Sequence, residues 1–429
     1  MPARTKEQDP VAIRINDRLD KLRSDSSSNR GLSGVHDRLH KVNPVEPVIL
    51  AVGPRFHGRR KLQEMEKQKF RYFKQLVERN INNMTGLNEY VNEIRGLEAR
   101  AREFYQLDDQ MASINSDDLA EILLIDGCFI VELLRKYKNR AQLRGDDPIF
   151  RLDQLRFVLR RDLILLENQL PFFVLDHLFR KTRGPGEEDH LIPLALAFLE
   201  QIMPNQKLEV VNYIGSHEVK HLLGLVHSSW GHRFVQALGE TNRVSQDDVE
   251  DIWEFIESAT ELKEAGVELK MMKSRSNLFS IQFNKKTGVL EMPCLCIGDY
   301  TQFPLRNLLA YEQDHLQADD QPKYVGHYLA FINCLVQSPK DVQLLRQKRV
   351  IESWLGDDAA VYNMLKGVYR FVLISAGNYS YSRVCMDVNH YCKRHRDDWM
   401  TKLKIGGGFL LFLTLVQTLF TIVSCFKGN

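Results

Sequence analysis

Three histidines and a glutamate occur at the spacing of a zinc protease. The stretch reads His217-Glu-Val-Lys-His221-Leu-Leu-Gly224-Leu-Val-His227, which satisfies the metzincin signature H-E-x-x-H-x-x-G-x-x-H. In that chemistry His217, His221 and His227 bind the metal ion. Gly224 allows the chain to bend before the third ligand, and Glu218 deprotonates the zinc-bound water. The pattern predicts a zinc-dependent hydrolase as one alternative.

The same stretch also has the pattern of an ordinary amphipathic helix. Its apolar residues recur at helical spacing and would form a core stripe, namely Val219, Leu222, Leu223 and Val226. The chain begins without an apolar run of 7–15 residues, so we expect no secretory signal peptide. A signature without its structural context is weak evidence. We therefore expect no catalytic residues, no cofactor and no bound metal, and we predict that the chain is not an enzyme.

Two other predicted helices place carboxylates among large apolar neighbours. Asp126 falls on an apolar stripe, and the stretch that begins at Asp162 adds Glu167 and Asn168. A buried carboxylate must find a partner or lose its charge. An acid–base pair is one reading, but we favour a buried structural network. Its candidate partners are Arg156, Arg160 and Arg161, and a similar structural role is expected for Arg306, Asn307 and Glu312.

Helical periodicity dominates the elements that must position these residues. It predicts helices at about residues 62–77, 87–106, 116–137, 152–181, 190–202, 208–229, 246–263, 304–316, 322–336, 340–352, 357–378 and 382–403. Pro171 should kink or split the helix in which it lies. Strands are predicted at 47–52, 267–272, 278–283 and 289–297, with a hairpin loop at 284–288. The expected fold class is mainly α: a multi-helix globular domain with a small antiparallel β-sheet and a C-terminal transmembrane helix.

The two ends of the chain differ from its middle. Residues 1–34 are polar and are expected to form a flexible tail with a short helix near 11–22, before a helical domain over 35–400. Residues 405–426 carry no charge and would span about 33 Å as a helix. Basic residues are more frequent before this segment than after it, which keeps the N-terminal domain in the cytoplasm. We expect a single-pass protein of the plasma membrane or an endomembrane.

The composition excludes several other classes of protein. Lysine and arginine number 58 against 56 aspartates and glutamates, a net charge of +2, which leaves nucleic-acid binding without an electrostatic basis. The content of 44% hydrophobic and 27% charged residues is that of a globular protein. The seven cysteines are scattered and form no C-x-x-C pair. We therefore expect neither a disulfide framework nor a structural zinc ribbon.

Several segments together carry a resemblance to a known family. They are Val52-Gly-Pro-Arg-Phe-His-Gly58, Leu62-Gln-Glu-Met-Glu66 with Lys69, Asp126-Gly-Cys-Phe-Ile-Val-Glu-Leu-Leu134, Arg161-Asp-Leu-Ile-Leu-Leu-Glu-Asn-Gln-Leu-Pro-Phe-Phe-Val-Leu175, Ala259-Thr-Glu-Leu262 and Leu305-Arg-Asn-Leu-Leu-Ala-Tyr-Glu-Gln313. In this order they resemble the plant family known as domain of unknown function 247, over about residues 33–425. The family's first motif usually reads closer to Gly-Pro-Tyr-His-His-Gly, so Arg55 and Phe56 stand in place of Tyr and His.

The resemblance implies a function in recognition. The family has no established enzymatic activity, and some members are linked to self-incompatibility in grasses. We therefore expect a membrane-anchored plant protein that binds an unidentified protein partner without catalysis, in self-incompatibility or signalling. Its membrane contact would be made by residues 405–426, and the sequence does not set its oligomeric state.

Overall fold

The structure is a computed structural model of the 429-residue chain. It describes residues 8–24, 46–80, 84–105, 114–142, 147–184, 186, 188–203, 208, 219–241, 254–272, 278–315, 323–370, 372–373, 379–397 and 413–418. The chain divides into two compact units where the sequence predicted one helical domain. Unit 1 comprises Met1–Arg233 and Tyr300–Gln321, and unit 2 comprises Phe234–Asp299 and Pro322–Asn429.

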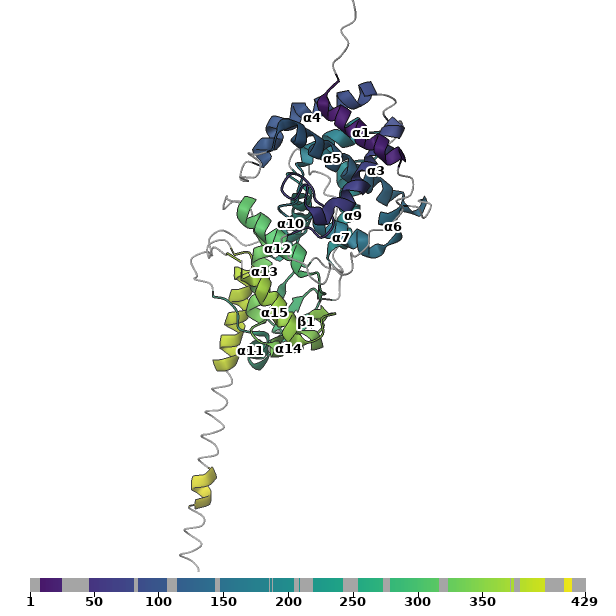
Figure 1. The fold of residues 1–429 in the computed structure, drawn as a ribbon. Coiled ribbons are helices and arrows are strands. Elements are labelled where there is room, and N and C mark those ends of the chain that lie inside the picture. Colours follow the sequence, from purple (N-terminus) through teal and green to yellow (C-terminus); the bar gives the residue numbers. More distant parts are fainter. Residues whose placement is uncertain are drawn as a thin grey trace, which may run out of the picture. The chain divides into compact units, whose positions relative to one another are not determined.

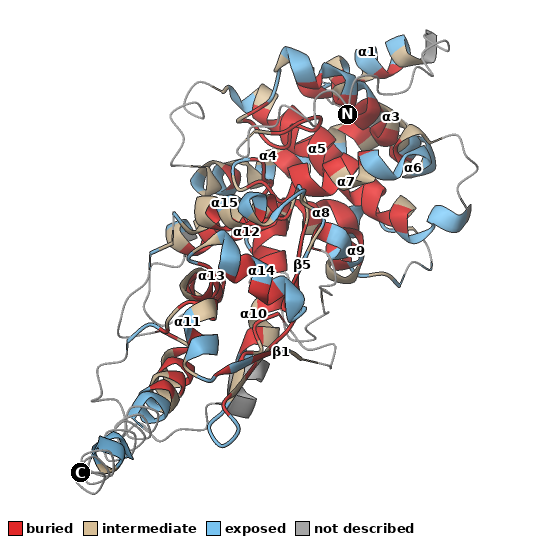
Figure 2. Ribbon diagram, turned by 90° about the horizontal axis from the view of Figure 1, so that it is seen from below, coloured by how far each residue is buried: buried red, intermediate tan, exposed pale blue. Residues whose placement is uncertain are grey.

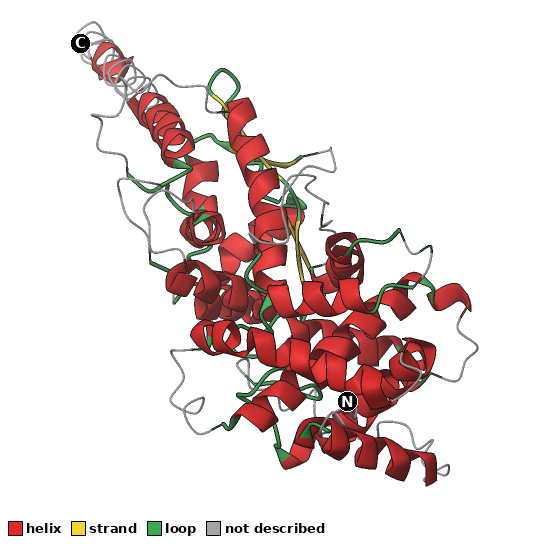
Figure 3. Ribbon diagram, turned by 90° about the horizontal axis from the view of Figure 1, so that it is seen from above, coloured by secondary structure: helices red, strands yellow, loops and turns green. Residues whose placement is uncertain are grey.

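The described part of unit 1 is helical, as the red ribbons of Figure 3 show. Its α-helices are α1 (Pro10–Ser24), α3 (Gln63–Asn80), α4 (Met84–Phe104), α5 (Ser116–Lys138), α6 (Pro148–Arg151), α7 (Asp153–Leu163), α8 (Phe172–Lys181), α9 (Leu191–Leu199), α12 (Gln302–His315) and the first part of α10 (Leu222–Thr241). Short 3₁₀ turns are η1 (Arg60–Leu62), η3 (Arg140–Gln142) and η4 (Glu200–Ile202). The predicted break at Pro171 is confirmed, because α7 ends at Leu163 and α8 begins directly after the proline.

Helix α5 forms the centre of unit 1 and is buried on almost every face (Figure 2). Its start is fixed by Asn115, whose side chain accepts the backbone N–H of Asp118 at 2.8 Å. Asp117 and Asp118 in the first turn and Arg135 in the last turn also complement the helix dipole. Helices α1, α3, α4, α8 and α9 pack around α5. An apolar surface on all sides is typical of such a core helix.

The expectation of a flexible tail over residues 1–34 is corrected for Pro10–Ser24, which form helix α1. Its residues Val11 and Ile15 are fully buried, and the helix packs on α5. Arg14 and Arg18 also form ion pairs with Glu121 of α5, each at 2.5 Å. This apolar face gives α1 a fixed place in unit 1, whereas residues 1–7 and 25–34 lie outside the described part of the chain.

Unit 2 combines helices with two small sheets. Its helices are α11 (Ala259–Glu264), α13 (Tyr324–Leu335), α14 (Pro339–Gln347), α15 (Asp358–Tyr369) and a helix at 382–397, and its strands are β1 (Glu268–Met271), β2 (Gln282–Asn284), β3 (Val289–Met292), β4 (Leu295–Ile297) and β5 (Ile351–Ser353). Figure 1 labels α11, α13, α14, α15 and β1 of this unit. The predicted hairpin loop is confirmed, with Gly288 in the left-handed region at φ 69°.

The sheets differ from the single antiparallel sheet that the sequence predicted. Strand β3 pairs with β2 in antiparallel and with β1 in parallel orientation, so the first sheet is mixed. Strand β4 follows Pro293 and pairs in parallel with β5 in a second sheet. Because proline has no backbone N–H, Pro293 cannot continue the hydrogen bonding of β3 in the first sheet. Residues 47–52 form no strand at all, because side chains rather than a neighbouring strand bind their backbone N–H groups.

The expected C-terminal transmembrane helix is not found. No helix among the described residues is long and apolar enough to cross a bilayer. Of the segment 405–426 the structure describes a helix at 413–418, and the rest of that prediction lies outside the described residues. The fold class is therefore corrected to a mainly helical chain with two small sheets, and the predicted single-pass membrane location is not supported.

Candidate functional site

The buried carboxylate of Asp162 holds the chain segment that precedes the first family motif. Its oxygens accept the backbone N–H groups of Val48, Ile49 and Leu50 at 2.9 to 3.1 Å, and Arg161 donates to it at 2.6 Å. Burial raises the pKa of Asp162, whereas the charge of Arg161 and the three N–H groups oppose this rise. All of these neighbours are donors, which favours the ionised form of the carboxylate.

Asn168 extends the same support along this segment. Its Oδ1 accepts the N–H of Val52 at 2.7 Å, and its Nδ2 donates to the carbonyls of Leu50 and Asp162 at 2.9 and 2.8 Å. Asp162 and Asn168 together thus bind four backbone N–H groups of this buried segment, as the pairing of buried N–H groups requires.

A second buried cluster surrounds Lys69, which has no exposed surface. Its ammonium donates to Asp126 at 2.6 Å and pairs with Glu66 at 2.5 Å, while the other oxygen of Asp126 accepts the N–H of Gly53 at 2.9 Å. Burial raises the pKa of Asp126 to about 6, against the lowering effect of Lys69. Burial lowers the pKa of Lys69, but the two carboxylates outweigh it and the pKa is raised.

The predicted structural network is confirmed for Asp126, Asp162 and Asn168, which are all buried and hydrogen-bonded. Arg161 is a partner as expected, whereas the sequence analysis missed Lys69 as the partner of Asp126. Arg156 and Arg160 donate instead to the backbone carbonyls of Phe150 and Phe198. Nothing in the local sequence pairs residue 69 with residue 126, since the contact joins two different helices.

In the motif loop at residues 53–58, the two residues that depart from the family's usual motif have different roles: Phe56 packs in the interior and Arg55 forms a surface ion pair. Phe56 is buried in a cluster with Ala51 and Leu62. Arg55 pairs with Glu167 at 2.8 Å, and both side chains are partly exposed. Glu167 is therefore not part of the buried network, contrary to expectation.

Three residues of α12 were expected to have a structural role, and this is confirmed for Asn307 and Glu312. Asn307 accepts the N–H of Leu166 and donates to the carbonyl of Phe303, both at 2.9 Å. Glu312 is fully buried and contacts His227. Arg306 lies half-buried on the same helix.

The described residues of the histidine motif do not have the arrangement of a zinc protease. His217 and Glu218 lie outside the described residues, and α10 begins only at Leu222, so His221 precedes the helix. The Nε2 atom of His227 faces the Glu312 carboxylate at 3.0 Å.

The ring of Tyr311 packs on both described imidazoles of this motif, with centroid distances of 5.2 Å to His221 and 5.0 Å to His227. A Cβ on Gly224 would lie 3.1 Å from the hydroxyl of Tyr311. The glycine thus allows the tyrosine to pack here, and His221, Gly224 and His227 all contact Tyr311 or Glu312.

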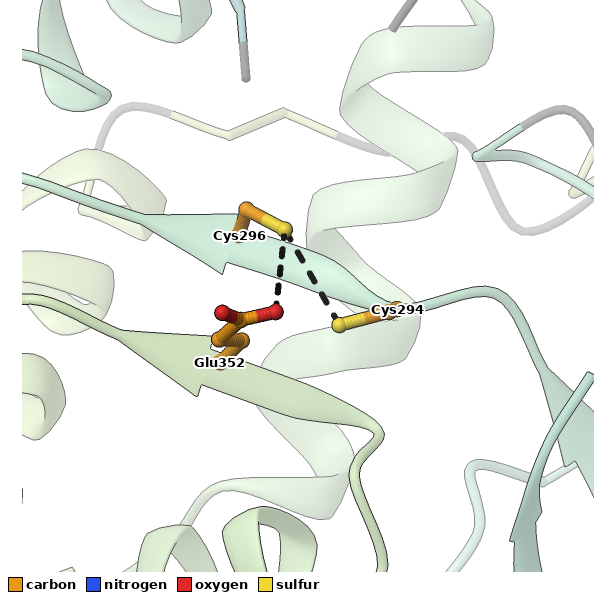
Figure 4. Close-up of side chains that lie close together, drawn as sticks. All are labelled: Cys294, Cys296 and Glu352. Atoms are coloured by element: carbon orange, nitrogen blue, oxygen red, sulfur yellow. Dashed lines mark hydrogen bonds between the residues drawn. The ribbon is translucent and has the colours of Figure 1, made fainter. Parts of the chain in front are cut away.

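A different group of side chains in unit 2 has donor atoms close enough to bind a metal. The thiols of Cys294 and Cys296 are 3.9 Å apart, and the thiol of Cys296 lies 3.9 Å from a carboxylate oxygen of Glu352 (Figure 4). The parallel register of β4 and β5 places Cys296 opposite Glu352, and Cys294 lies two residues earlier on the same face. The hydrogen bond with Cys296, followed by burial, raises the pKa of Cys294.

This thiol cluster opens on a groove of about 810 Å³ beside β5, to which Cys294 and Glu352 contribute. Other residues that line it are Met271, Gln343, Arg346, Gln347, Arg349, Ile351, Ser353 and Asp358. Arg346 pairs with Asp358 at 2.5 Å. Arg349 is exposed, and no carboxylate of the described residues pairs with it.

Arg349 has an unusual backbone conformation. It is the one non-glycine residue of the described chain with a positive φ, at 59°. The N–H of Val350 bonds to the carbonyl of Leu345 and the N–H of Arg349 to that of Arg346, both at 2.9 Å. This is the Schellman motif at the end of α14, in which glycine usually takes the position of Arg349. Sequence patterns gave no sign of this residue.

Comparison with known proteins identifies the family. The chain matches DUF247, described as plant protein of unknown function, over residues 33–424, and it belongs to that family. The resemblance seen in the sequence motifs is thus confirmed. The chain is 24% identical over 420 residues to UPF0481 protein At3g47200 of Arabidopsis thaliana, covering 90% of this chain and 84% of that protein.

A second relative from Arabidopsis thaliana, UPF0481 protein At3g02645, is 23% identical over 444 residues, covering 84% of this chain and 80% of that protein. No solved structure is significantly similar to the chain. Neither name states an activity, so functional inference depends on the residues themselves.

Proposed function

We propose that this chain is a recognition protein without catalytic activity, and that it binds an acidic segment of a partner protein in the groove beside β5. Self-incompatibility and signalling, which the family resemblance implies, are processes in which such binding would serve. The buried carboxylates of Asp126, Asp162 and Glu312 have a structural role in this proposal, because each is bound by a side chain or backbone N–H group of unit 1.

The observation that carries the proposal is the strained conformation of Arg349. A left-handed backbone costs an L-residue roughly 1–2 kcal/mol, and glycine would avoid this cost. A residue that keeps its side chain at such a position is a candidate for function. The side chain of Arg349 lines the groove and is exposed, so the guanidinium is available to a ligand.

Arg349 gives the groove a positive charge that can bind an acidic ligand, and the groove is lined by the carboxylates of Asp358 and Glu352 as well. Arg346 and Gln347 end α14 and are followed by Lys348 and Arg349, and the exposed Lys348 lies beside Arg349 in the chain. The negative charge of Asp358 is already matched by Arg346. An aspartate or glutamate of a partner could therefore accept a bidentate hydrogen bond from Arg349, the geometry that arginine provides for carboxylates.

Arg349→Gly should raise stability and lower binding at the same time. Removing the strain should raise the free energy of unfolding by about 0.5–1 kcal/mol, because the greater entropy of unfolded glycine offsets part of the gain. Binding of acidic peptides should weaken about ten-fold or more, or about 1.4 kcal/mol. Random peptides displayed on phage would be selected on the full-length chain and measured by fluorescence anisotropy, together with urea unfolding.

The matched control is Lys340→Gln, which removes an exposed positive charge at the other end of α14, away from the residues that line the groove. It should change neither stability nor peptide binding appreciably. Selection without enrichment of Asp or Glu, or equal peptide affinities of the wild type and Arg349→Gly, would refute the proposed binding site.

A further inference from the structure

We propose that Cys294, Cys296 and Glu352 bind one Zn²⁺ ion, with the fourth coordination position open to the groove. The three donor atoms lie within 4.8 Å of one another, and two of the residues line the groove. Figure 4 shows the sulfur of Cys296 on β4, the sulfur of Cys294 just before this strand and the carboxylate of Glu352 on β5 close together. This inference is independent of the proposed recognition of a partner.

The spacing of the donors is close to that of a tetrahedral zinc site. With Zn–S bonds of about 2.3 Å, tetrahedral geometry sets two sulfurs about 3.8 Å apart. The sulfurs of Cys294 and Cys296 are 3.9 Å apart. A sulfur and a carboxylate oxygen on the same ion would be about 3.6 Å apart, and the distance from Cys296 to Glu352 is 3.9 Å. The third pair of donors, on Cys294 and Glu352, lies within 4.8 Å, so these two atoms would approach each other by at most about 1.2 Å on binding the ion.

The donor set selects zinc among the common metal ions. Mg²⁺ and Ca²⁺ prefer sites composed of oxygen atoms, and Cu(I) prefers soft thiolate donors over a carboxylate. Zinc accepts sulfur and carboxylate oxygen together. On binding, each thiol loses its proton to solvent as a Zn–S bond forms, so two protons leave for each ion bound.

The register of the second sheet gives the ion a structural consequence. Strands β4 and β5 have three residues each, which is short for a stable pair. Cys296 and Glu352 are directly opposite each other across this pair. Zinc would therefore link the two strands and stabilise unit 2, since binding to the folded state alone shifts the unfolding equilibrium.

The test is a titration of the reduced full-length chain with Zn²⁺ alone, followed by isothermal calorimetry and by pH measurement in weak buffer. The wild type should bind one equivalent and release about two protons per ion. Cys296→Ser should lose this binding, and Glu352→Gln, a substitution of an exposed side chain, should weaken it at least ten-fold. Cys334→Ser is the control, because Cys334 is a half-buried thiol of unit 2 outside the cluster, and it should bind as the wild type does.

Three results would overturn the site. One is the absence of stoichiometric zinc in the reduced wild type. Another is zinc that survives Cys296→Ser but is lost in His221→Ala, which would assign the ion to the histidine motif. The third is a chain isolated with Cys294 and Cys296 oxidised to a disulfide that binds no zinc after reduction, as mass spectrometry and calorimetry would show.

Discussion

Asp162→Ala should destabilise unit 1 by about 3–5 kcal/mol, because it leaves Arg161 as a buried charge without its carboxylate. The substitution also removes the acceptor of three backbone N–H groups, on Val48, Ile49 and Leu50. Asp162→Asn should have an intermediate effect, since its amide keeps one accepting oxygen but turns an NH₂ group toward these donors. Urea unfolding of the full-length chain, followed by tryptophan fluorescence, measures the loss.

Hydrogen exchange provides the local test of the same prediction. The amides of Val48 to Leu50 should lose protection in Asp162→Ala well before the rest of unit 1. The control is Asp153→Ala, because the Asp153 side chain is 94% exposed and pairs with Arg156 at the surface, where such pairs contribute about 0–1 kcal/mol. If both variants unfolded at the same urea concentration, the carboxylate of Asp162 would not hold this segment.

Lys69→Met should destabilise the chain strongly at neutral pH and much less in acid. The variant leaves two carboxylates, Asp126 and Glu66, without the cation that both contact, which should cost about 3–5 kcal/mol at pH 7. The pKa of Asp126 is already raised to about 6 by burial, and loss of Lys69 should raise it further. The folded variant therefore binds a proton that the unfolded chain releases near pH 4, so its stability should fall as the pH rises from 4 to 7.

The measurement is urea unfolding of wild type and variant at several pH values between 4 and 8. The double variant Lys69→Met with Asp126→Asn should recover part of the lost stability at pH 7, because the buried negative charge is removed. Lys61→Met is the matched control, since Lys61 pairs with Glu46 in a partly exposed setting and should contribute at most about 1 kcal/mol. A pH-independent difference between Lys69→Met and wild type would show that the ion pair is not responsible.

The local features of this protein could be read from its sequence with good success. Helix α5 was predicted at 116–137 and extends over Ser116–Lys138, because apolar residues on every turn and a capping asparagine act within a few residues of one another. The burial of Asp162 and Asn168 was also predicted, since both lie in an apolar stretch of sequence. The order of the family motifs fixed the family, which the match over residues 33–424 confirms.

Hydropathy at the carboxyl end was a less reliable guide. An uncharged apolar stretch predicted a transmembrane helix at 405–426, but the described residues include no helix of the required length. Likewise, β-branched residues at 47–52 predicted a strand, although these residues bind to side chains instead. Such patterns give the secondary structure that a segment prefers, but the groups that it contacts in the fold come from distant parts of the chain.

The sequence by itself therefore determined the helical class, the family and the burial of Asp126, Asp162 and Asn168, since these depend on local periodicity and composition. Only the tertiary structure decided which groups meet. Lys69 reaches Asp126 across 57 residues and Cys296 meets Glu352 across 56, through helix packing and a parallel strand register that no local pattern encodes. The positive φ of Arg349 was equally hidden, because it follows from where α14 ends and β5 begins. Contacts over such distances are set by the packing of whole elements, and the candidate sites of this protein consist of those contacts.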